Sequence, residues 1–263
     1  MLEYEFMRNA FMAGSAVAIV GGAVGFFLVL RNLTFAGHAL SHVGFAGAAG
    51  SMLLGINALW GLLAFTLAAG IAMGLLGERL RGRDVAVGIV LSLALGLGVL
   101  FLSLYTTGAT QATAILFGNV FGVSLEAVWV LVGLSALSLG ALAFVSRPLL
   151  FATLAPELAE AKGAPVRLVS VLFLAIVAIA VAEAAQVVGV LLVFVLMVAP
   201  AAAALRLTTR AGPGLALAVI LALAETWIGI ALAYATDWPT TFWIVVVSCV
   251  IYFASAIKRT TRT

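Results

Sequence analysis

The sequence predicts an all-α membrane protein, a polytopic transmembrane helical bundle with eight or nine spans that forms one domain over residues 1–263. Apolar residues make up 65% of the chain and charged residues 9%, whereas a soluble domain is about half apolar and a quarter charged. The mean hydropathy is +1.28. Apolar runs of about twenty residues recur along the chain, and each is long enough to cross about 30 Å of hydrocarbon.

Nine stretches meet this length requirement. The predicted spans are residues 11–30, 35–54, 58–76, 85–105, 125–145, 168–185, 187–205, 214–235 and 240–257. One of these stretches need not cross the membrane completely, so the sequence is consistent with eight or nine spans. Residues 106–124 are too many for a tight turn and too apolar for a solvated loop, which indicates a partly re-entrant segment. Gly70 with Gly74, and Gly118 with Gly122, have the spacing at which helix backbones approach closely.

The basic residues predict the orientation of the spans. If each span crosses once, nearly all lysines and arginines fall on one side, which is then the cytoplasm. These residues are Arg31, Arg79, Arg81, Arg83, Arg147, Lys162, Arg167, Arg206, Arg210, Lys258, Arg259 and Arg262. Arg8 is the exception, because this count puts the N-terminus outside. The net charge of +3 therefore reports topology and does not indicate nucleic-acid binding.

The second predicted span carries both histidines of the protein, His38 and His42. Residues four apart lie on one face of a helix, so two imidazoles can present two nitrogens to one metal ion. His42 is expected near the middle of the bilayer. Two ligands are too few for a closed zinc site, so the others must come from another helix, another subunit or water. The alternative is a pair of packing histidines that bond to neighbouring carbonyl groups.

Two glutamates lie within predicted spans. A charged carboxylate inside a membrane helix costs about 2.5–3.5 kcal/mol unless it faces a cavity or a partner. Glu225 lies deeper and is the candidate for a further metal ligand or a proton relay. Glu183 lies near the outer end of its span, so we expect it at the rim.

A short helix is predicted on the cytoplasmic side at about residues 154–164. Pro156 suits its first turn, Glu157 and Glu160 complement its positive end, Lys162 complements its negative end, and Gly163 stops it. This segment is either a docking helix for a soluble partner or a solvated linker.

The sequence does not favour an enzyme, and no catalytic residue is assigned. It has no G-x-x-x-x-G-K-[ST] loop for splitting a nucleotide, no H-E-x-x-H and no G-x-S-x-G. The HALSH pair lacks the glutamate that a metalloprotease uses as general base.

Several motifs in the same order resemble the permease subunits of manganese, zinc and iron ABC importers, the ABC-3 family. They are FFLVLRNLTFAGHALSHVGFAGAAG, DVAVGIVLSLALGLGVL, ILFGNVFGVS, APELAEAKGAPVR and QVVGVLLVFVLMVAPAAAA. The resemblance runs nearly from end to end. It implies an ATP-binding cassette permease in a bacterial cytoplasmic (inner) membrane that forms a homodimer. ATP hydrolysis would lie in ATPase subunits docked at Pro156, Glu157, Glu160, Lys162 and Gly163, and an extracytoplasmic metal-binding protein would deliver the ion.

The resemblance also implies a cargo. In the family an acidic residue and a histidine four apart contact the metal, and here those positions are His38 and His42. Nitrogen in place of oxygen disfavours manganese and favours zinc. We therefore expect zinc as transported cargo, with no permanently bound cofactor. A permease for manganese, iron or a chelate, an intramembrane metal-dependent enzyme, and a scaffold with structural histidines are the alternatives.

Overall fold

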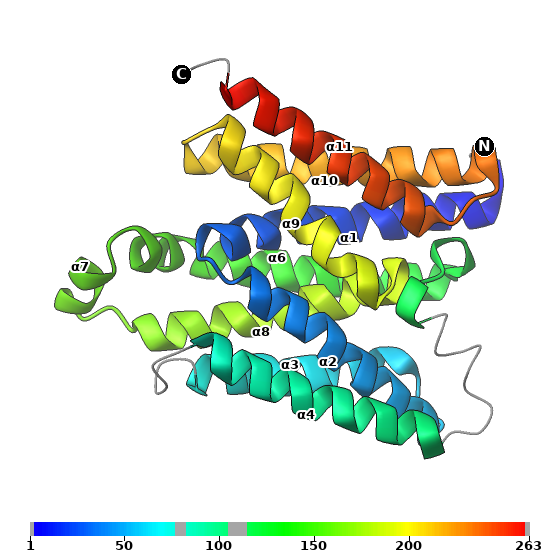
Figure 1. The fold of residues 1–263 in the computed structure, drawn as a ribbon, viewed down its shortest axis with the longest axis horizontal. Coiled ribbons are helices and arrows are strands. Elements are labelled where there is room, and N and C mark those ends of the chain that lie inside the picture. The colour runs from blue at the N-terminus through cyan, green and yellow to red at the C-terminus, as the bar shows by residue number, and fades with distance from the viewer. Residues whose placement is uncertain (1–2, 77–82, 105–114, 261–263) are drawn as a thin grey trace.

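The computed structural model describes residues 3–76, 83–104 and 115–260, which are helical almost throughout (Figure 1). The all-α prediction is confirmed. The long helices are α1 (Glu5–Leu30), α2 (Thr34–Leu53), α3 (Ala58–Leu76), α4 (Arg83–Leu104), α6 (Leu125–Leu154), α8 (Val166–Val188), α9 (Val190–Leu207), α10 (Ala211–Thr236) and α11 (Thr240–Thr260). The short elements among these residues are the 3-10 turn η1 (Val120–Gly122) and α7 (Pro156–Ala161).

Successive long helices run back and forth through the bundle, so the two chain termini lie at opposite ends (Figure 1). The α7 end also receives the α1–α2 and α9–α10 connections, and Arg31, Arg206 and Arg210 lie in or next to these connections. This arrangement matches the one predicted from the basic residues. Arg79, Arg81 and Arg262 of that prediction lie outside the described residues.

Eight of the described helices are long and apolar enough to cross a membrane. The remaining long helix, α2, is not among them. Its sequence contains both histidines, a threonine and two serines, which lower its hydropathy. Most of α2 is nevertheless buried, chiefly against α3 and α4. A helix that is covered mostly by other helices needs less apolar surface than a helix that faces lipid, which is consistent with the lower hydropathy of α2.

Helices α1 and α8 form the centre of the bundle, since most of each is buried. Helix α1 packs on α9 and α10, and α8 packs on α3 and α6. Helices α2, α3 and α4 lie together at one edge (Figure 1). Gly70 and Gly74 of α3 face α8 at close range, where an added Cβ would lie 2.8 Å from the Leu174 carbonyl oxygen and 3.0 Å from the Val171 Cα. The predicted close approach at this glycine pair is therefore confirmed.

The predicted span ends, which were expected to be uncertain by several residues, differ from the helix ends, and two of these differences have a structural reason. Helix α6 continues nine residues past the predicted end at residue 145 and includes Pro148. A proline removes one backbone hydrogen bond, and the remaining bonds of a long helix can carry it past that point. The second boundary is the break between the sixth and seventh spans, which lies at Gly189. Glycine tolerates the positive φ of 84° found there, which other residues disfavour.

The break at Gly189 contacts the chain just before η1. Gly118 has a φ of 72°, and an added Cβ would overlap the backbone of Val188 and Gly189. An added Cβ on Gly189 would likewise overlap Gly118 and Phe117. The prediction that Gly118 and Gly122 form a helical packing pair was therefore wrong, because Gly118 is not helical and its close partner is Gly189. Residues 106–114 of the predicted re-entrant segment lie outside the described residues.

The corner between α1 and α2 is closed by a pair of backbone hydrogen bonds. The Leu33 N–H donates to the Leu28 carbonyl at 2.9 Å, and the Asn32 N–H donates to the Val29 carbonyl at 3.0 Å. Asn32 has a φ of 55°. This is the Schellman pattern, in which a left-handed residue lets two late carbonyls of a helix find donors. Leu33 and Leu28 are both buried, so the corner is bonded and packed.

Candidate metal-binding site

His38 and His42 lie on adjacent turns of α2. Their ring centroids are 4.7 Å apart, and the ring planes meet at 85°. The edge-to-face arrangement follows from the i, i+4 spacing on a regular helix. His42 lies eight residues past the start of α2, or about 12 Å along an axis that rises 1.5 Å per residue. The pair therefore lies on the α7 side of the middle of a helix of twenty residues.

The histidines lie on the side of α2 that α3 and α4 leave partly open. Both rings are half-buried, while Ala39, Leu40 and Val43 beside them are buried. Phe194 of α9 lies against His38, with ring centroids 5.2 Å apart. Helix α9 thus forms one wall beside the pair. Both rings remain partly exposed within one protomer.

The structure provides no carbonyl partner for one nitrogen of the pair. His38 Nδ1 is buried and has no hydrogen-bond partner among the described residues. The Ser41 hydroxyl donates to the His38 backbone carbonyl at 2.7 Å and so leaves the ring free. A buried polar atom without a partner costs free energy comparable to a lost hydrogen bond. The packing alternative therefore lacks the carbonyl partner that it requires at this nitrogen, and the role of the pair as metal ligands stays a prediction.

One protomer holds only part of a coordination shell at this place. Within the described residues, no group of three or more histidine, cysteine, aspartate or glutamate side chains is placed to hold a metal ion. The pair can therefore supply two nitrogens, and any further ligands must come from water, carbonyl groups or another chain. A partly filled shell binds an ion less tightly than a closed structural site.

Glu225, the candidate third ligand, lies on α10 and is fully buried. The Ser248 hydroxyl of α11 donates to its Oε2 at 2.6 Å, and Oε1 has no partner among the described residues. Helix α10 packs on α1, α9 and α11, whereas α2 packs chiefly on α3 and α4. The structure thus does not bring Glu225 together with the histidines of its own chain, and its role as a metal ligand stays a prediction.

Glu183 also differs from its predicted place. We expected it at the rim, but its side chain is fully buried between α8 and α6. The hydroxyls of Ser135 and Ser138 donate to its two oxygens at 2.8 and 2.9 Å. Both serines are buried as well. The carboxyl group therefore joins two helices, because two small donors one turn apart on α6 face it.

We expect Glu183→Ala to lower the free energy of unfolding by about 1–3 kcal/mol, since interhelical hydrogen bonds in membranes contribute about 0.6 and at most about 1.7 kcal/mol each. Glu183→Gln retains an acceptor and should lose less. Thermal unfolding in detergent measures both. Glu126→Ala, at an exposed glutamate in the first turn of α6, is the matched control and should change little. Equal midpoints for the two alanine variants would contradict the prediction.

A short helix, α7, lies at the predicted residues, and its place on the cytoplasmic side stays a prediction. Pro156 occupies its first position, and Gly163 has a φ of 73° just past its end. Glu157, Leu158 and Glu160 are exposed, and Ala159 is the residue of the helix that faces inward. Lys162 lies over the Phe151 ring of α6 at 5.9 Å. The exposed side of the helix thus carries Leu158 and two acidic side chains, while Ala159 rests on the bundle.

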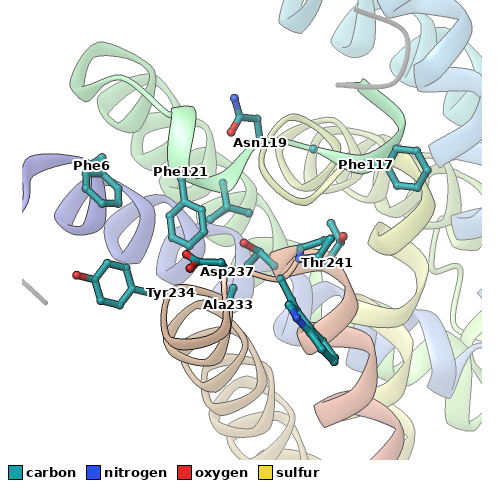
Figure 2. A pocket seen from close by; sticks show the side chains of 13 residues that line it. Phe6, Phe117, Asn119, Phe121, Ala233, Tyr234, Asp237 and Thr241 are labelled. Carbon is teal, nitrogen blue, oxygen red and sulfur yellow. The ribbon is translucent and has the colours of Figure 1, made fainter. Parts of the chain in front are cut away.

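A pocket of about 580 Å³ lies at the opposite end of the bundle, between the start of α1, the η1 segment and the α10–α11 turn (Figure 2). Aromatic side chains dominate it, among them Phe6, Phe121 and Tyr234, and Asp237 is the acidic residue of its lining. Tryptophan and tyrosine gather where a membrane helix meets water. The orientation predicted from the basic residues would make this the outer end of the bundle, and the histidine pair is not part of the pocket's lining.

Sequence reasoning missed the partners of the buried polar groups. Arg31, Ser170, Ser135 and Ser248 all lie in or next to predicted spans, where a polar side chain is costly and needs a partner. That cost predicts that each of these side chains has a hydrogen-bonding partner. It does not say which helix supplies the partner, so the pairs were not predictable.

The fold and this pair of side chains define a class of protein: a polytopic helical membrane protein with two partly buried imidazoles on adjacent turns of one helix. The chain belongs to the ABC 3 transport family, whose model matches residues 3–259. It is similar to the manganese import system permease protein ScaB of Streptococcus parasanguinis, with 33% identity over 176 residues. It is also similar to a probable metal transport system membrane protein of Treponema pallidum, with 36% identity over 166 residues.

These matches have different extents. The first covers 66% of this chain and 62% of the relative, and the second covers 62% and 61%. A solved structure of PsaBC from Streptococcus pneumoniae in complex with Fab is similar over 97% of this chain and 92% of that chain, with a TM-score of 0.86 and 27% identity. An inward-facing structure of a putative metal-chelate type ABC transporter shares the fold, with a TM-score of 0.66 and 15% identity.

Proposed function

We propose that this chain is the membrane permease subunit of an ATP-binding cassette importer for a divalent transition metal ion. The observation that carries the proposal is the pair of imidazoles on adjacent turns of α2, 4.7 Å apart between ring centroids, with one buried nitrogen left without a partner. Membership of the ABC 3 transport family and relatives named for metal transport support it.

A second copy of the chain would complete the site. Partly exposed imidazoles are costly in contact with lipid, so this side of α2 is expected to be covered by protein or to line a water-filled passage. A copy related by a two-fold axis would bring a second pair of histidines to the same place. Four imidazoles, or two with water, match the nitrogen-rich shells that zinc accepts. An ion held between two protomers is released when they move apart.

The cargo that we propose is zinc. His38 contributes nitrogen at the position where family members usually have aspartate, and imidazole favours zinc over manganese, which prefers oxygen ligands. Manganese is the second candidate, because two of the relatives are named for manganese import or manganese transport. Zinc and manganese are expected to prefer different ligand atoms at position 38, so one substitution at this position can distinguish the two candidate cargoes.

The energy source is proposed to lie outside this chain. The sequence has no phosphate-binding loop, so ATP hydrolysis belongs to soluble partner subunits. Helix α7 offers them Glu157, Leu158 and Glu160 at the basic end of the bundle. An extracytoplasmic metal-binding protein would deliver the ion at the other end, where the aromatic pocket lies (Figure 2).

The test of the cargo is a competition experiment with His38→Asp. Vesicles containing the permease and its ATPase subunits are given radioactive zinc with excess unlabelled manganese, and then the reverse. For the unchanged chain we expect zinc to exclude manganese. For His38→Asp we expect the ratio of zinc uptake to manganese uptake to fall by about tenfold or more, because an oxygen ligand suits manganese better than nitrogen does. A tenfold change in this ratio corresponds to about 1.4 kcal/mol in relative binding free energy.

Two outcomes would contradict this. If excess zinc does not reduce the uptake of radioactive manganese by either protein, manganese and not zinc is the cargo. ATP-dependent uptake of neither metal, from a complex that hydrolyses ATP, would contradict the metal permease itself. Ser41→Ala is the matched control, because it changes a neighbouring polar residue of α2 without changing an imidazole.

A further inference from the structure

Arg31 lies in the corner between α1 and α2 and contacts α6 and α8, the two helices that flank α7 in the chain. Its Nη2 donates to the Ser170 hydroxyl of α8 at 2.9 Å, and its Nη1 donates to the Thr153 hydroxyl of α6 at 3.5 Å. The guanidinium also lies 5.8 Å from the centre of the Phe173 ring on α8. Thr153 lies three residues before α7 begins, and Ser170 lies nine residues after it ends. A single side chain thus contacts both arms of the α6–α7–α8 hairpin.

The two arms of this hairpin are also joined deeper in the bundle. Glu183 of α8 accepts hydrogen bonds from Ser135 and Ser138 of α6. The arms therefore have polar connections at two levels, one beside the α7 end and one in the buried interior. A force applied at α7 is expected to move Thr153 and Ser170 together, because their helices are bonded to each other.

The other end of the connection is rigid as well. Arg31 is the C-cap of α1, and the Schellman bonds from Asn32 and Leu33 follow immediately. An added Cβ on Gly37 would lie 2.6 Å from a Leu28 methyl group, so the first turn of α2 lies directly against the last turns of α1. His38 follows Arg31 by seven residues. A displacement of Arg31 therefore turns the beginning of α2 rather than being absorbed by a flexible loop.

We propose that Arg31 is the positioning residue that transmits movement of α7 to α2, and so links the ATP-driven step to release of metal from His38 and His42. This inference rests on the proposed function, because it takes α7 as the docking helix and the histidines as metal ligands. Arginine suits the role, since its planar guanidinium holds five N–H donors in a fixed arrangement and can bond two hydroxyls at once. A lysine keeps the charge but not this geometry.

The competing explanation is that Arg31 only fixes topology as a basic residue on the cytoplasmic side. Arg31→Lys separates the two explanations, because it preserves the charge and removes the two-hydroxyl contact. Arg210→Lys is the matched control. Arg210 is an exposed arginine at the start of α10, on the same side of the membrane. The double variant Thr153→Val with Ser170→Ala removes the acceptors and leaves the arginine in place.

The experiment uses the complete complex of permease and ATPase subunits in vesicles. ATP hydrolysis and uptake of radioactive zinc are measured in the same preparation, and thermal unfolding reports folding. We expect Arg31→Lys and the double variant to hydrolyse ATP and to move at least tenfold less zinc per ATP. Arg210→Lys should match the unchanged chain. An unchanged amount of zinc transported per ATP in Arg31→Lys would overturn the inference. If Arg31→Lys does not fold, the same result in the double variant would overturn it.

A second readout does not depend on the cargo. Phe35, in the first turn of α2, is exposed and can be replaced by cysteine after Cys249→Ala removes the native thiol. We expect ATP to change the rate at which a thiol reagent labels Phe35→Cys, and expect Arg31→Lys to abolish that change. A preserved ATP-dependent change in Arg31→Lys would overturn the inference. No metal uptake by any variant, with the ATP-dependent change intact in the parent, would count against the proposed function alone.

Discussion

His42→Ala is expected to abolish metal uptake, with an initial rate reduced by at least about 100-fold. Loss of a residue that only supports a metal ligand already lowers affinity or activity by about 10–100-fold, and His42 is proposed to bind the metal directly. One protomer has two imidazoles at this place, so the substitution removes half of its ligands. In a dimer the same change removes one ligand from each copy.

The measurement is ATP-dependent uptake of radioactive zinc into vesicles, normalised to the amount of folded permease. His42→Asp, which retains a ligand of another type, should keep part of the activity with an altered metal preference. Ser41→Ala should transport like the unchanged chain. Because alanine is a good helix former and His42 is half-buried, we expect the fold to persist. Undiminished uptake at a normal protein level would remove His42 from the site.

Gly189→Ala is expected to lower the free energy of unfolding by more than about 4 kcal/mol, a loss that single substitutions rarely cause. Gly189 has φ 84° and ψ 153°, a region that is essentially restricted to glycine and costs other residues about 1–3 kcal/mol. Steric overlap adds to this strain. A Cβ would occupy the space of the Gly118 and Phe117 backbones, which belong to another segment and cannot turn aside as a side chain would.

The matched control is Gly55→Ala. Gly55 also has a positive φ, 70°, but an added Cβ would meet nothing within 4 Å. It should therefore show the backbone strain without the overlap, at a cost of about 1–2 kcal/mol. Gly118→Ala should behave like Gly189→Ala, because its Cβ would overlap Val188 and Gly189. Thermal unfolding in detergent and the yield of folded protein measure these effects. Equal midpoints for Gly189→Ala and Gly55→Ala would contradict the prediction.

The candidate site was predictable in part. The spacing of His38 and His42 places them on one face of any helix, and α2 satisfied that condition. The third ligand was less accessible to sequence reasoning. Glu225 and Glu183 were both recognised as costly buried carboxylates, but each turned out to bond serines of a neighbouring helix. A carboxylate in a span predicts a partner without identifying it.

The sequence by itself determined the helices and their approximate ends, because a span must satisfy its own backbone hydrogen bonds within the membrane. It also determined α7, whose proline and glycine signals are local. The orientation that the basic residues indicate stays a prediction. Only the tertiary structure decided which helices are neighbours. The contact of Gly118 with Gly189, the serines around Glu183 and the hydroxyls at Arg31 join residues far apart in the chain. Such pairs depend on how helices pack side by side, and that arrangement is set by close packing of many small residues together.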